Sequence, residues 1–334
     1  MSDTTGQDQQ QNMRRVALTS LAGTSIEWYD FFLYATAAAV IFPIAFFPQE
    51  DPTTALLISF SSLAVGFLAR PLGGIVFGHF GDRIGRKRTL VVALMMMGIT
   101  TTLIGFLPTY ASIGVAAPIL LVLLRFVQGL AIGGQWGGAM LLVTESAPAD
   151  QRGWYGAYAQ AGAPLGVVLA NLAFIGVSSS MSDEAFMDWG WRLPFIASIV
   201  LIGISMYIQL KIEDTQAFQS LSNAQSATDK PAETVKRSPV IEAIRKYPKR
   251  IMLAAGAFLS VQVTFYILIA FVISYGMQSP NLMLSKDLML TAVLVAAAIM
   301  VPTQFYFSGL SDRIGRKNVY RWGAILTGAW GFAL

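Results

Sequence analysis

The chain has 334 residues, of which 54% are hydrophobic and 13% are charged, and it contains no cysteine. A typical soluble domain is about 25% charged, so this composition excludes an ordinary soluble protein. The lack of cysteine excludes disulfides and thiolate metal ligands. The net charge of +4 does not indicate a nucleic-acid partner, because the basic residues lie in short segments between long apolar blocks.

The apolar blocks are long enough to form membrane-spanning helices, since about 20 apolar residues cross the hydrocarbon core. The first block is too long for the hydrophobic part of a signal peptide, so we expect it to be retained as a span. In chain order, the sequence predicts spans at about 16–46, 55–79, 89–108, 119–143, 154–177, 191–211, 250–277 and 287–308. A ninth span is expected to begin near Val319 and to be cut off at Leu334.

Lysine and arginine residues are distributed unevenly between these spans. Most of them lie in the N-terminal segment and in every second connection after it, whereas the other connections carry acids such as Glu50 and Asp183. The exceptions are Arg70, Arg125, Arg192 and Lys286. Because basic residues are retained on the cytoplasmic side, this pattern predicts a cytoplasmic N-terminus.

The longest polar stretch lies between the sixth and seventh spans. It is rich in Gln, Ser, Asn and Lys, a composition typical of a linker. The sequence therefore predicts four parts: a cytoplasmic N-terminus at 1–15, a six-helix bundle at 16–212, a cytoplasmic linker at 213–249 and an incomplete C-terminal bundle at 250–334.

The hexapeptide DRIGRK occurs twice in the chain. It begins at Asp82, after the second predicted span, and again at Asp312, after the eighth, which is the same place within each half. The alternative is a coincidence of two basic loops. Parallel internal duplication is typical of transporters built from two bundles, so we predict that architecture.

Longer motifs around the repeat carry a family resemblance. They are IEWYDFFLY from Ile26, ARPLGGIVFGHFGDRIGRK from Ala69, RFVQGLAIGGQWGGA from Arg125, WGWRLPF from Trp189 and SGLSDRIGRKN from Ser308. Together they resemble the metabolite:proton symporter branch of the major facilitator superfamily, in particular its shikimate-type, organic-acid and betaine members. The resemblance implies an all-α polytopic membrane protein of two six-helix bundles, with the C-terminal bundle truncated in this chain. One departure is Gln135, where family members usually carry Glu.

Ionisable residues within the spans are candidates for function, because charge is unfavourable at membrane depth. At a rise of ~1.5 Å per residue, Glu27 lies about 16 Å and Asp30 about 21 Å from the inner end of the first span, and Arg125 matches the depth of Asp30. We predict that Asp30 carries a coupling proton, with Glu27 as second choice, and that protonation releases Arg125 toward an anionic substrate. The alternative is a structural ion pair.

Further polar side chains are predicted to line a central cavity. Gln160 and Asn171 share one face of the fifth span, and Gln262 and Tyr266 share one face of the seventh. The alternative for the amides is hydrogen bonding between helices. The predicted substrate-binding residues are Arg125, Tyr34, Gln135, Gln160, Asn171, Gln262 and Tyr266.

Glycines recur at every fourth position in two spans. Gly129, Gly133 and Gly137 have this spacing in the fourth span, and Gly162 and Gly166 have it in the fifth. Because removing side chains lets helix backbones approach each other, the spacing predicts close helix packing. No Lys-Ser/Thr pair follows these glycines, so a phosphate-binding loop is not indicated.

The resemblance also implies a role for the repeated loop. In the family, its aspartate latches the two bundles in the outward-open state by pairing with arginine and with the N-terminal end of a span in the opposite half. Asp82 is therefore expected to contact Arg152 and a span beyond Leu334, and Asp312 the start of the fifth span. The predicted latch residues are Gly78, Asp82, Arg83, Gly85, Arg86, Lys87, Arg152, Asp312, Arg313, Gly315 and Arg316.

The sequence offers no metal-ligand cluster, cofactor loop or accessible Ser/His/Asp set, so an enzyme is not favoured. We predict a secondary active transporter of the inner (plasma) membrane that imports a small polar metabolite, either an organic acid such as shikimate or a dicarboxylate, or a betaine, by proton symport with alternating access. The alternatives are a drug or metabolite exporter of the same superfamily and a transport-incompetent truncated product. We expect no cofactor or metal, and a monomer whose partners are substrate, protons and lipid.

Overall fold

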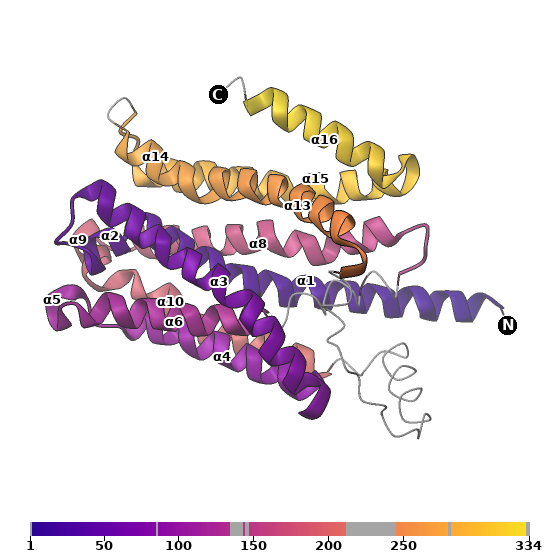
Figure 1. Ribbon diagram of the computed structural model, residues 1–334, viewed down its shortest axis with the longest axis horizontal. Coiled ribbons are helices and arrows are strands. Elements are labelled where there is room, and N and C mark those ends of the chain that lie inside the picture. The colour runs from indigo at the N-terminus through magenta and orange to yellow at the C-terminus, as the bar shows by residue number, and fades with distance from the viewer. Residues whose placement is uncertain are drawn as a thin grey trace.

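The computed structural model describes residues 2–84, 86–133, 143, 147–211, 245–279 and 282–331, and every regular element in these ranges is a helix. Most of the helices run nearly along the long axis of the molecule (Figure 1). In chain order they are α1 (Ser2–Val40), α2 (Phe42–Phe46), α3 (Pro52–Ile84), α4 (Arg86–Phe106), α5 (Tyr110–Ile113), α6 (Ala116–Gly133), α8 (Arg152–Ser178), α9 (Asp183–Ala185), η1 (Phe186–Gly190), α10 (Arg192–Lys211), α13 (Pro248–Tyr266), η2 (Ile267–Phe271), α14 (Val272–Gln278), α15 (Lys286–Ile314) and α16 (Arg316–Gly331).

Five helices in the described ranges are long and apolar enough to cross a membrane: Pro52–Gly78, Ala116–Gly133, Arg152–Ser178, Pro248–Met277 and Lys286–Ile314. A sixth span would be formed by Asp183–Gly190 together with Arg192–Ile204, which are bent by 51°. Helix α1 is long but less apolar, because Glu27 and Asp30 interrupt its hydrophobic part. Its polar residues must therefore be covered by neighbouring helices.

The helices of the first half pack as close neighbours. Helix α1 lies along α8, α3 lies against α6, and α4 lies against α10. Gly129 and Gly133 of α6 bring its backbone against the carbonyl groups of Gly66 and Arg70 on α3, where an added Cβ would collide. Gly162 and Gly166 of α8 accommodate α1 in the same way. The predicted close packing at these four glycines is confirmed, whereas Gly137 lies outside the described residues.

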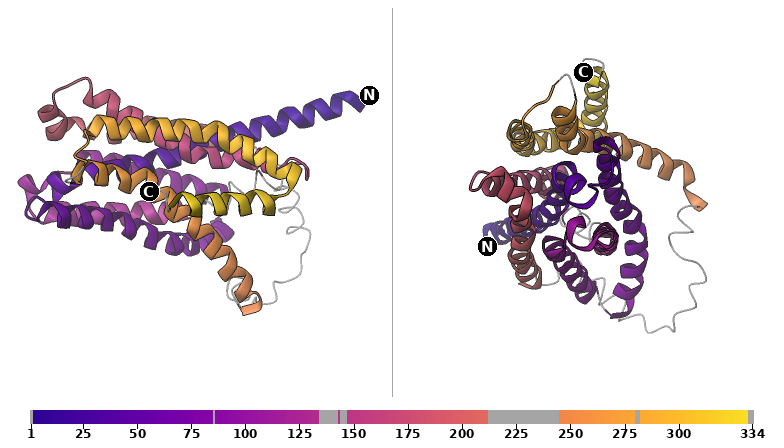
Figure 2. Two further views of the ribbon diagram at one scale, coloured as in Figure 1. Left: turned by 90° about the horizontal axis from the view of Figure 1, so that it is seen from above. Right: turned by 90° about the vertical axis from the view of Figure 1, so that its left-hand side faces the viewer.

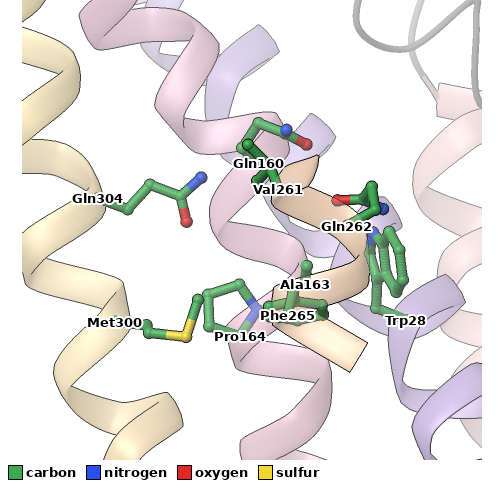
Figure 3. Close-up of a pocket in the computed structure, with 9 residues that line it drawn as sticks. All are labelled: Trp28, Gln160, Ala163, Pro164, Val261, Gln262, Phe265, Met300 and Gln304. Carbon is green, nitrogen blue, oxygen red and sulfur yellow. The ribbon is translucent and has the colours of Figure 1, made fainter. Parts of the chain in front are cut away.

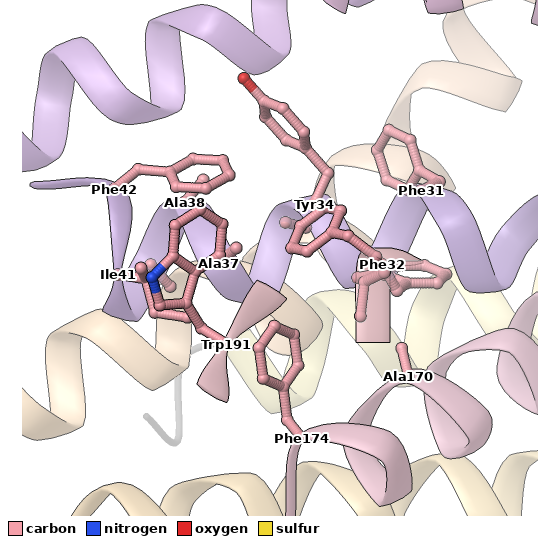
Figure 4. Close-up of a cluster of buried hydrophobic side chains, with 14 of the residues drawn as sticks. Phe31, Phe32, Tyr34, Ala37, Ala38, Ile41, Phe42, Ala170, Phe174 and Trp191 are labelled. Atoms are coloured by element: carbon pink, nitrogen blue, oxygen red, sulfur yellow. The ribbon is translucent and has the colours of Figure 1, made fainter. Parts of the chain in front are cut away.

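An aromatic core fills one end of this half. Phe42 of α2, Trp191 just before α10 and Phe174 of α8 are fully buried (Figure 4). Phe195 of α10 is fully buried as well. The rings of Phe42 and Trp191 lie 6.0 Å apart in an edge-to-face arrangement, which is the geometry that aromatic pairs prefer. This core holds the C-terminal part of α1 in place.

The second half, α13 to α16, lies on one side of the first (Figure 2). Helix α15 packs along α8 and is the main contact between the halves, whereas α16 is exposed on nearly all sides. A break at Gly315 separates α15 from α16. Its φ of +90° favours glycine, which explains the glycine in the second DRIGRK motif. Most of the predicted linker at 213–249 lies outside the described residues.

The loop before α3 lies outside the membrane spans and is held by its own side chain. Asp51 Oδ1 accepts hydrogen bonds from the backbone N–H groups of Thr53 and Thr54, each at 3.1 Å. Hydrogen bonds from the side chain and backbone of Thr54 hold the pKa of Asp51 below its usual range. Such an arrangement satisfies N–H groups in the first turn of the helix, so α3 has a well-defined start.

Candidate functional site

Two side chains of opposite charge are buried in the middle of the first half. Asp30 of α1 is 0% exposed and Arg125 of α6 is 1% exposed. The sequence placed them at one depth, and the structure brings them into one polar network. It does not bring them into direct contact, since no ion pair joins them among the described residues. The two charges are linked through intervening side chains.

Gln128 and Thr101 occupy the space between the two charges. Arg125 Nη1 donates to Gln128 Oε1 at 2.6 Å, and Gln128 Nε2 donates to Thr101 Oγ1 at 2.8 Å. Thr101 Oγ1 in turn donates to Asp30 Oδ2 at 3.1 Å. The result is a hydrogen-bonded chain from α6 through α4 to α1. Neither Gln128 nor Thr101 was among the predicted residues, because a lone amide or hydroxyl in a span gives no signal beyond its polarity.

Arg125 is held by aromatic faces as well as by Gln128. Its guanidinium carbon lies 4.2 Å from the ring centroid of Tyr34 and 5.0 Å from that of Phe31, and such contacts contribute about 0.5–2 kcal/mol each. Gly66 of α3 makes room for this side chain, since a Cβ there would lie 2.8 Å from Arg125 Nε. The Tyr34 hydroxyl hydrogen-bonds Ser62 Oγ at 2.6 Å. The hydrogen bond to Ser62 therefore holds the Tyr34 ring against the guanidinium of Arg125.

The network is not fully satisfied internally. Asp30 Oδ1 and Arg125 Nε are buried without a hydrogen-bond partner in the described part of the chain. Buried polar groups of this kind are normally paired, and leaving one unpaired costs about 1–3 kcal/mol. Unpaired atoms at the centre of a membrane helix bundle are therefore retained against a stability cost, which favours a functional role.

A second charged group lies between α1, α3 and α13. Glu27 is within Coulombic range of Arg70 and Asp30, and Arg70 has Tyr266 as its other neighbour. The guanidinium of Arg70 stacks 4.4 Å from the ring centroid of Phe67. Arg70 Nε and the Tyr266 hydroxyl are both buried without a hydrogen-bond partner in the described ranges. Arg70 is thus the cation nearest in effect to Glu27, whereas Asp30 is connected to Arg125 by the hydrogen-bonded chain.

A cleft of about 120 Å³ opens between the two halves. Gln160 of α8, Gln262 of α13 and Gln304 of α15 reach it from three helices (Figure 3). Trp28 of α1 and Phe265 of α13 contribute aromatic surface. The remaining lining residues are Ala163, Pro164, Val261 and Met300.

The cleft contains some of the predicted substrate-binding residues and not others. Gln160 and Gln262 line it, as the sequence predicted, and Trp28 and Gln304 were missed. Arg125, Tyr34, Asn171 and Tyr266 do not line it; Gln135 lies outside the described residues. Asn171 is 1% exposed, and its Nδ2 donates to the Val167 carbonyl at 2.9 Å. Its helix face is the predicted one, but it lies about 16 Å along the axis from Gln160.

The two halves are joined at one end by the second DRIGRK motif. Asp312 Oδ1 accepts from the Gly153 N–H at 2.9 Å, and Oδ2 accepts from the Trp154 N–H at 2.8 Å. These N–H groups form the first turn of α8, which attracts a negative charge. The predicted contact of Asp312 with this helix start is confirmed. Gly153 permits it, because a Cβ there would lie 2.6 Å from the Ser308 carbonyl oxygen.

Of the other predicted latch residues, some make few contacts across this end and the rest lie outside the described residues. Arg316 contacts Asp312 at 3.7 Å, while Arg152 and Arg313 are exposed. Gly78 is exposed with open space around its Cα. The side chains of Asp82, Arg83, Arg86 and Lys87, together with Gly85, lie outside the described residues.

A weaker contact joins the halves at the opposite end. Lys286 at the start of α15 lies 3.3 Å from Asp183 of α9, and its ammonium group lies 4.5 Å from the ring centroid of Phe186. Asp183 is 91% exposed at its side chain, so this ion pair is screened by solvent. Within the described residues, no cluster of three or more His, Cys, Asp or Glu side chains could hold a metal ion.

Two packed sets of membrane helices, bridged at both ends around a central cleft, define a polytopic transporter fold. The chain belongs to the Major Facilitator Superfamily, whose family model matches residues 18–334. It is a multi-pass membrane transporter and not an enzyme. This confirms the family and the all-α fold expected from the motifs.

Named relatives cover nearly the whole chain. It is 42% identical over 313 residues to the shikimate transporter of Escherichia coli (strain K12), covering 94% of this chain and 70% of the relative. It is 42% identical over 309 residues to an inner membrane metabolite transport protein of the same organism, covering 91% and 68%. It is also 33% identical over 319 residues to the E. coli proline/betaine transporter, covering 94% and 62%.

The fold is that of a solved sugar transporter. A proton:xylose symporter bound to 6-bromo-6-deoxy-D-glucose superimposes with a TM-score of 0.67 at 15% identity, covering 92% of this chain and 70% of the symporter. At this identity the likeness concerns the fold alone. These comparisons place the chain among inner-membrane metabolite transporters and leave its substrate to be argued from the site.

Proposed function

We propose that the protein imports a small polar metabolite by proton symport, with alternating access around the central cleft. The observation that carries this proposal is the buried network of Asp30 and Arg125, whose carboxylate and guanidinium groups each keep one unpartnered atom. Charged groups at membrane depth are energetically costly, so their presence there indicates a role in transport or proton transfer. A carboxylate that gains and loses a proton there can change how firmly a nearby arginine is held.

The cleft supports an organic acid with hydroxyl groups, such as shikimate, as the substrate. Each of Gln160, Gln262 and Gln304 both donates and accepts hydrogen bonds, which suits hydroxyl groups that also do both. The flat faces of Trp28 and Phe265 suit a small ring. A betaine is the alternative, because the same aromatic faces can hold a quaternary ammonium group. A dicarboxylate is less well supported, since none of the cleft-lining residues is charged.

Asp30 is the proposed proton site and Glu27 the second candidate. Asp30 is the more deeply buried and is linked to Arg125 by the hydrogen-bonded chain, whereas Glu27 lies with Arg70. Arg125, once released, is proposed to attract the carboxylate of the substrate. Tyr34, Asn171 and Tyr266 are proposed to act from outside the cleft, as supports or as contacts that form when the halves move.

The end joined by Asp312 is proposed to be cytoplasmic, in keeping with the basic residues around it and a cytoplasmic N-terminus. Its contact with α8 is proposed to act as the latch that closes the cytoplasmic side. We further propose the division into an N-terminus at 1–15, a first bundle at 16–212, a linker at 213–249 and a second bundle from 250 to 334. The transporter is proposed to work as a monomer.

Uptake by the protein reconstituted in liposomes tests the proposal. We expect labelled shikimate to accumulate when the outside is more acidic than the inside, and a protonophore to abolish the accumulation. Labelled glycine betaine and 2-oxoglutarate, measured in parallel, decide between substrate classes. Uptake that is indifferent to the protonophore would contradict symport, and a preference for outward movement would favour an exporter.

A further inference from the structure

The Thr101 hydroxyl has one proton but lies within hydrogen-bonding distance of two acceptors and one donor. It lies 3.1 Å from Asp30 Oδ2, 2.9 Å from the Met97 carbonyl oxygen and 2.8 Å from Gln128 Nε2. The amide Nε2 can only donate, so the hydroxyl accepts from Gln128 in every state. The single hydroxyl proton must then choose between Asp30 and Met97.

The protonation state of Asp30 decides that choice. When Asp30 is ionised, the hydroxyl donates to its carboxylate, since a hydrogen bond to a charged acceptor is roughly twice as strong as a neutral one. When Asp30 binds a proton, the new O–H donates to Thr101 Oγ1, and the hydroxyl proton turns to the Met97 carbonyl. The three hydrogen-bonding neighbours of Thr101 Oγ1 are compatible with both states, which differ by one added proton.

We propose that Thr101 and Gln128 are positioning residues that transmit the protonation state of Asp30 to Arg125. With Asp30 ionised, the polarised hydroxyl is a better acceptor for Gln128, and the polarised amide is a better acceptor for Arg125, because hydrogen bonds in a chain strengthen one another. Protonation reverses this and loosens the hold of Gln128 on Arg125. The inference rests on the proposed proton symport and adds to it the path by which the proton acts.

The orientation of Gln128 is fixed by its two neighbours. Arg125 can only donate, so Oε1 must face it, and Nε2 must then face Thr101. Gln128 is 0% exposed and Thr101 is 0% exposed, so solvent does not compete for these bonds. The amide therefore works as a rigid connector between α6 and α4.

The surroundings of Asp30 contain few other ionisable groups. On α1 these are Glu27 and Tyr29, and Arg125 faces it from α6. Arg70 of α3 acts on both Glu27 and Arg125, whereas Tyr34 of α1 and Tyr266 of α13 act on Arg125. In the described ranges, α4 and α10 contribute the hydroxyl groups of Thr101 and Ser198. Among the described residues, the chain through Thr101 and Gln128 is thus a hydrogen-bonded connection between the carboxylate and the arginine.

The test removes the hydroxyl without changing the shape of the side chain. Thr101→Val is compared with Thr100→Val, because within the described residues Thr100 Oγ1 bonds only to the Met96 and Met97 carbonyls of its own helix. The protein is reconstituted in liposomes with labelled shikimate as the probe. Proton-driven accumulation is measured beside substrate exchange at equal pH on both sides, which needs no net proton movement.

We expect Thr101→Val to lower the accumulation ratio about tenfold, the factor expected when a hydrogen bond to a charged group is lost, with exchange reduced by at most about twofold. Thr101→Ser should restore accumulation, and Thr100→Val should match wild type. Gln128→Met, which keeps the shape and removes both bonds, should reproduce the defect, so a folding failure of one variant does not decide the result.

The outcomes separate the relay from the transport proposal. Equal accumulation by Thr101→Val and Thr100→Val, in a wild-type protein that responds to the proton gradient, would overturn the relay and leave symport standing. Parallel loss of exchange and accumulation in Thr101→Val would also overturn it, since that pattern indicates a general defect. A wild-type protein that transports shikimate without regard to the gradient would overturn both.

Discussion

The two halves of the molecule differ in what they bury. In the first half, the spans contain Glu27, Asp30, Arg70 and Arg125, and the helices close around these charges through glycine contacts. In the second half, the sequence carries no charged residue between Arg250 and Lys286 or between Asp287 and Asp312. The second half instead offers amides and aromatic surface to the cleft, and a carboxylate to the start of α8.

The difference indicates a division of labour. The first half buries the proposed proton site and its arginine, whereas the second half adds uncharged lining to a cleft that both halves form and supplies the carboxylate at one end. Close packing around the buried charges of the first half suits alternating access, because the proposed proton site would stay intact while the two halves move relative to each other. The predictions below test this division, beginning with the largest expected effect.

Asp30→Asn should reduce proton-driven accumulation to the level of empty liposomes while leaving exchange measurable, because the neutral amide cannot bind and release the coupling proton. The control is Asp287→Asn, an exposed acid at the start of α15 in the second half, which should behave as wild type. Full accumulation by Asp30→Asn would indicate Glu27 as the proton site. A defect in Asp287→Asn would show that acids of the second half also contribute to proton coupling.

Asp312→Asn should open the end that this residue closes. Hydrogen bonds to a charged acceptor contribute about 1.5–3 kcal/mol each, so losing the charge at two N–H groups should shift the open population about tenfold or more. The chain contains no cysteine, so spin labels at Gln151→Cys and Lys317→Cys report the distance between the halves without background labelling. An unchanged distance distribution would show that Asp312 does not set this equilibrium.

Gly129→Ala should destabilise the first half, since the added Cβ collides with the Gly66 carbonyl oxygen. Overpacking of this kind costs about 1–3 kcal/mol. Gly256→Ala in α13 is the matched control, because nothing lies within 4 Å of a Cβ there and alanine favours a helix. Thermal unfolding in detergent should show a lower midpoint for Gly129→Ala only. Equal midpoints would mean that the first half is less tightly packed than its glycine contacts indicate.

Gln160→Ala and Gln304→Ala should weaken shikimate binding by similar factors, about two- to tenfold, as expected for one lost neutral hydrogen bond. One amide comes from each half, so similar losses mean that both halves contact the substrate. Binding measured by calorimetry separates this from effects on transport. Asn171→Ala serves as the comparison: a loss equal to that of Gln160→Ala would extend the site along α8, as the sequence analysis predicted.

Regular spacing made much of this molecule predictable. The apolar runs and the repeated hexapeptide are local patterns, and a fixed rise per residue placed Asp30 and Arg125 at one depth. That reasoning did not reveal how far α4 and α6 are rotated about their axes. Thr101 and Gln128 bridge the charges because of that rotation, and no periodic signal in a single helix reports it.

The cleft likewise could not be predicted from patterns within single helices. Gln160 and Asn171 share a helix face, yet a cleft opens at only one of them, because its position depends on where α13 and α15 meet α8. Trp28 was read as part of a motif, although its neighbours in space come from α8 and α13. A face is thus a property of one helix, whereas a cavity is a property of several.

The smallest effect is expected at the end opposite Asp312. Asp183→Asn removes the charge that faces Lys286, and an exposed ion pair contributes about 0–1 kcal/mol. The open population at this end should therefore rise by no more than about fivefold. Labels at Ser180→Cys and Leu282→Cys report it.

High salt supplies the control for Asp183→Asn, since it screens exposed charges within a few ångströms. The wild-type protein and the variant should then give the same distance distribution, whereas the effect of Asp312→Asn should persist because its partners are backbone N–H groups in a less exposed position. A large, salt-insensitive effect of Asp183→Asn would mean that the contact on Phe186 depends on this charge. The two ends would then be latched with comparable strength, and the second half would open either way with equal ease.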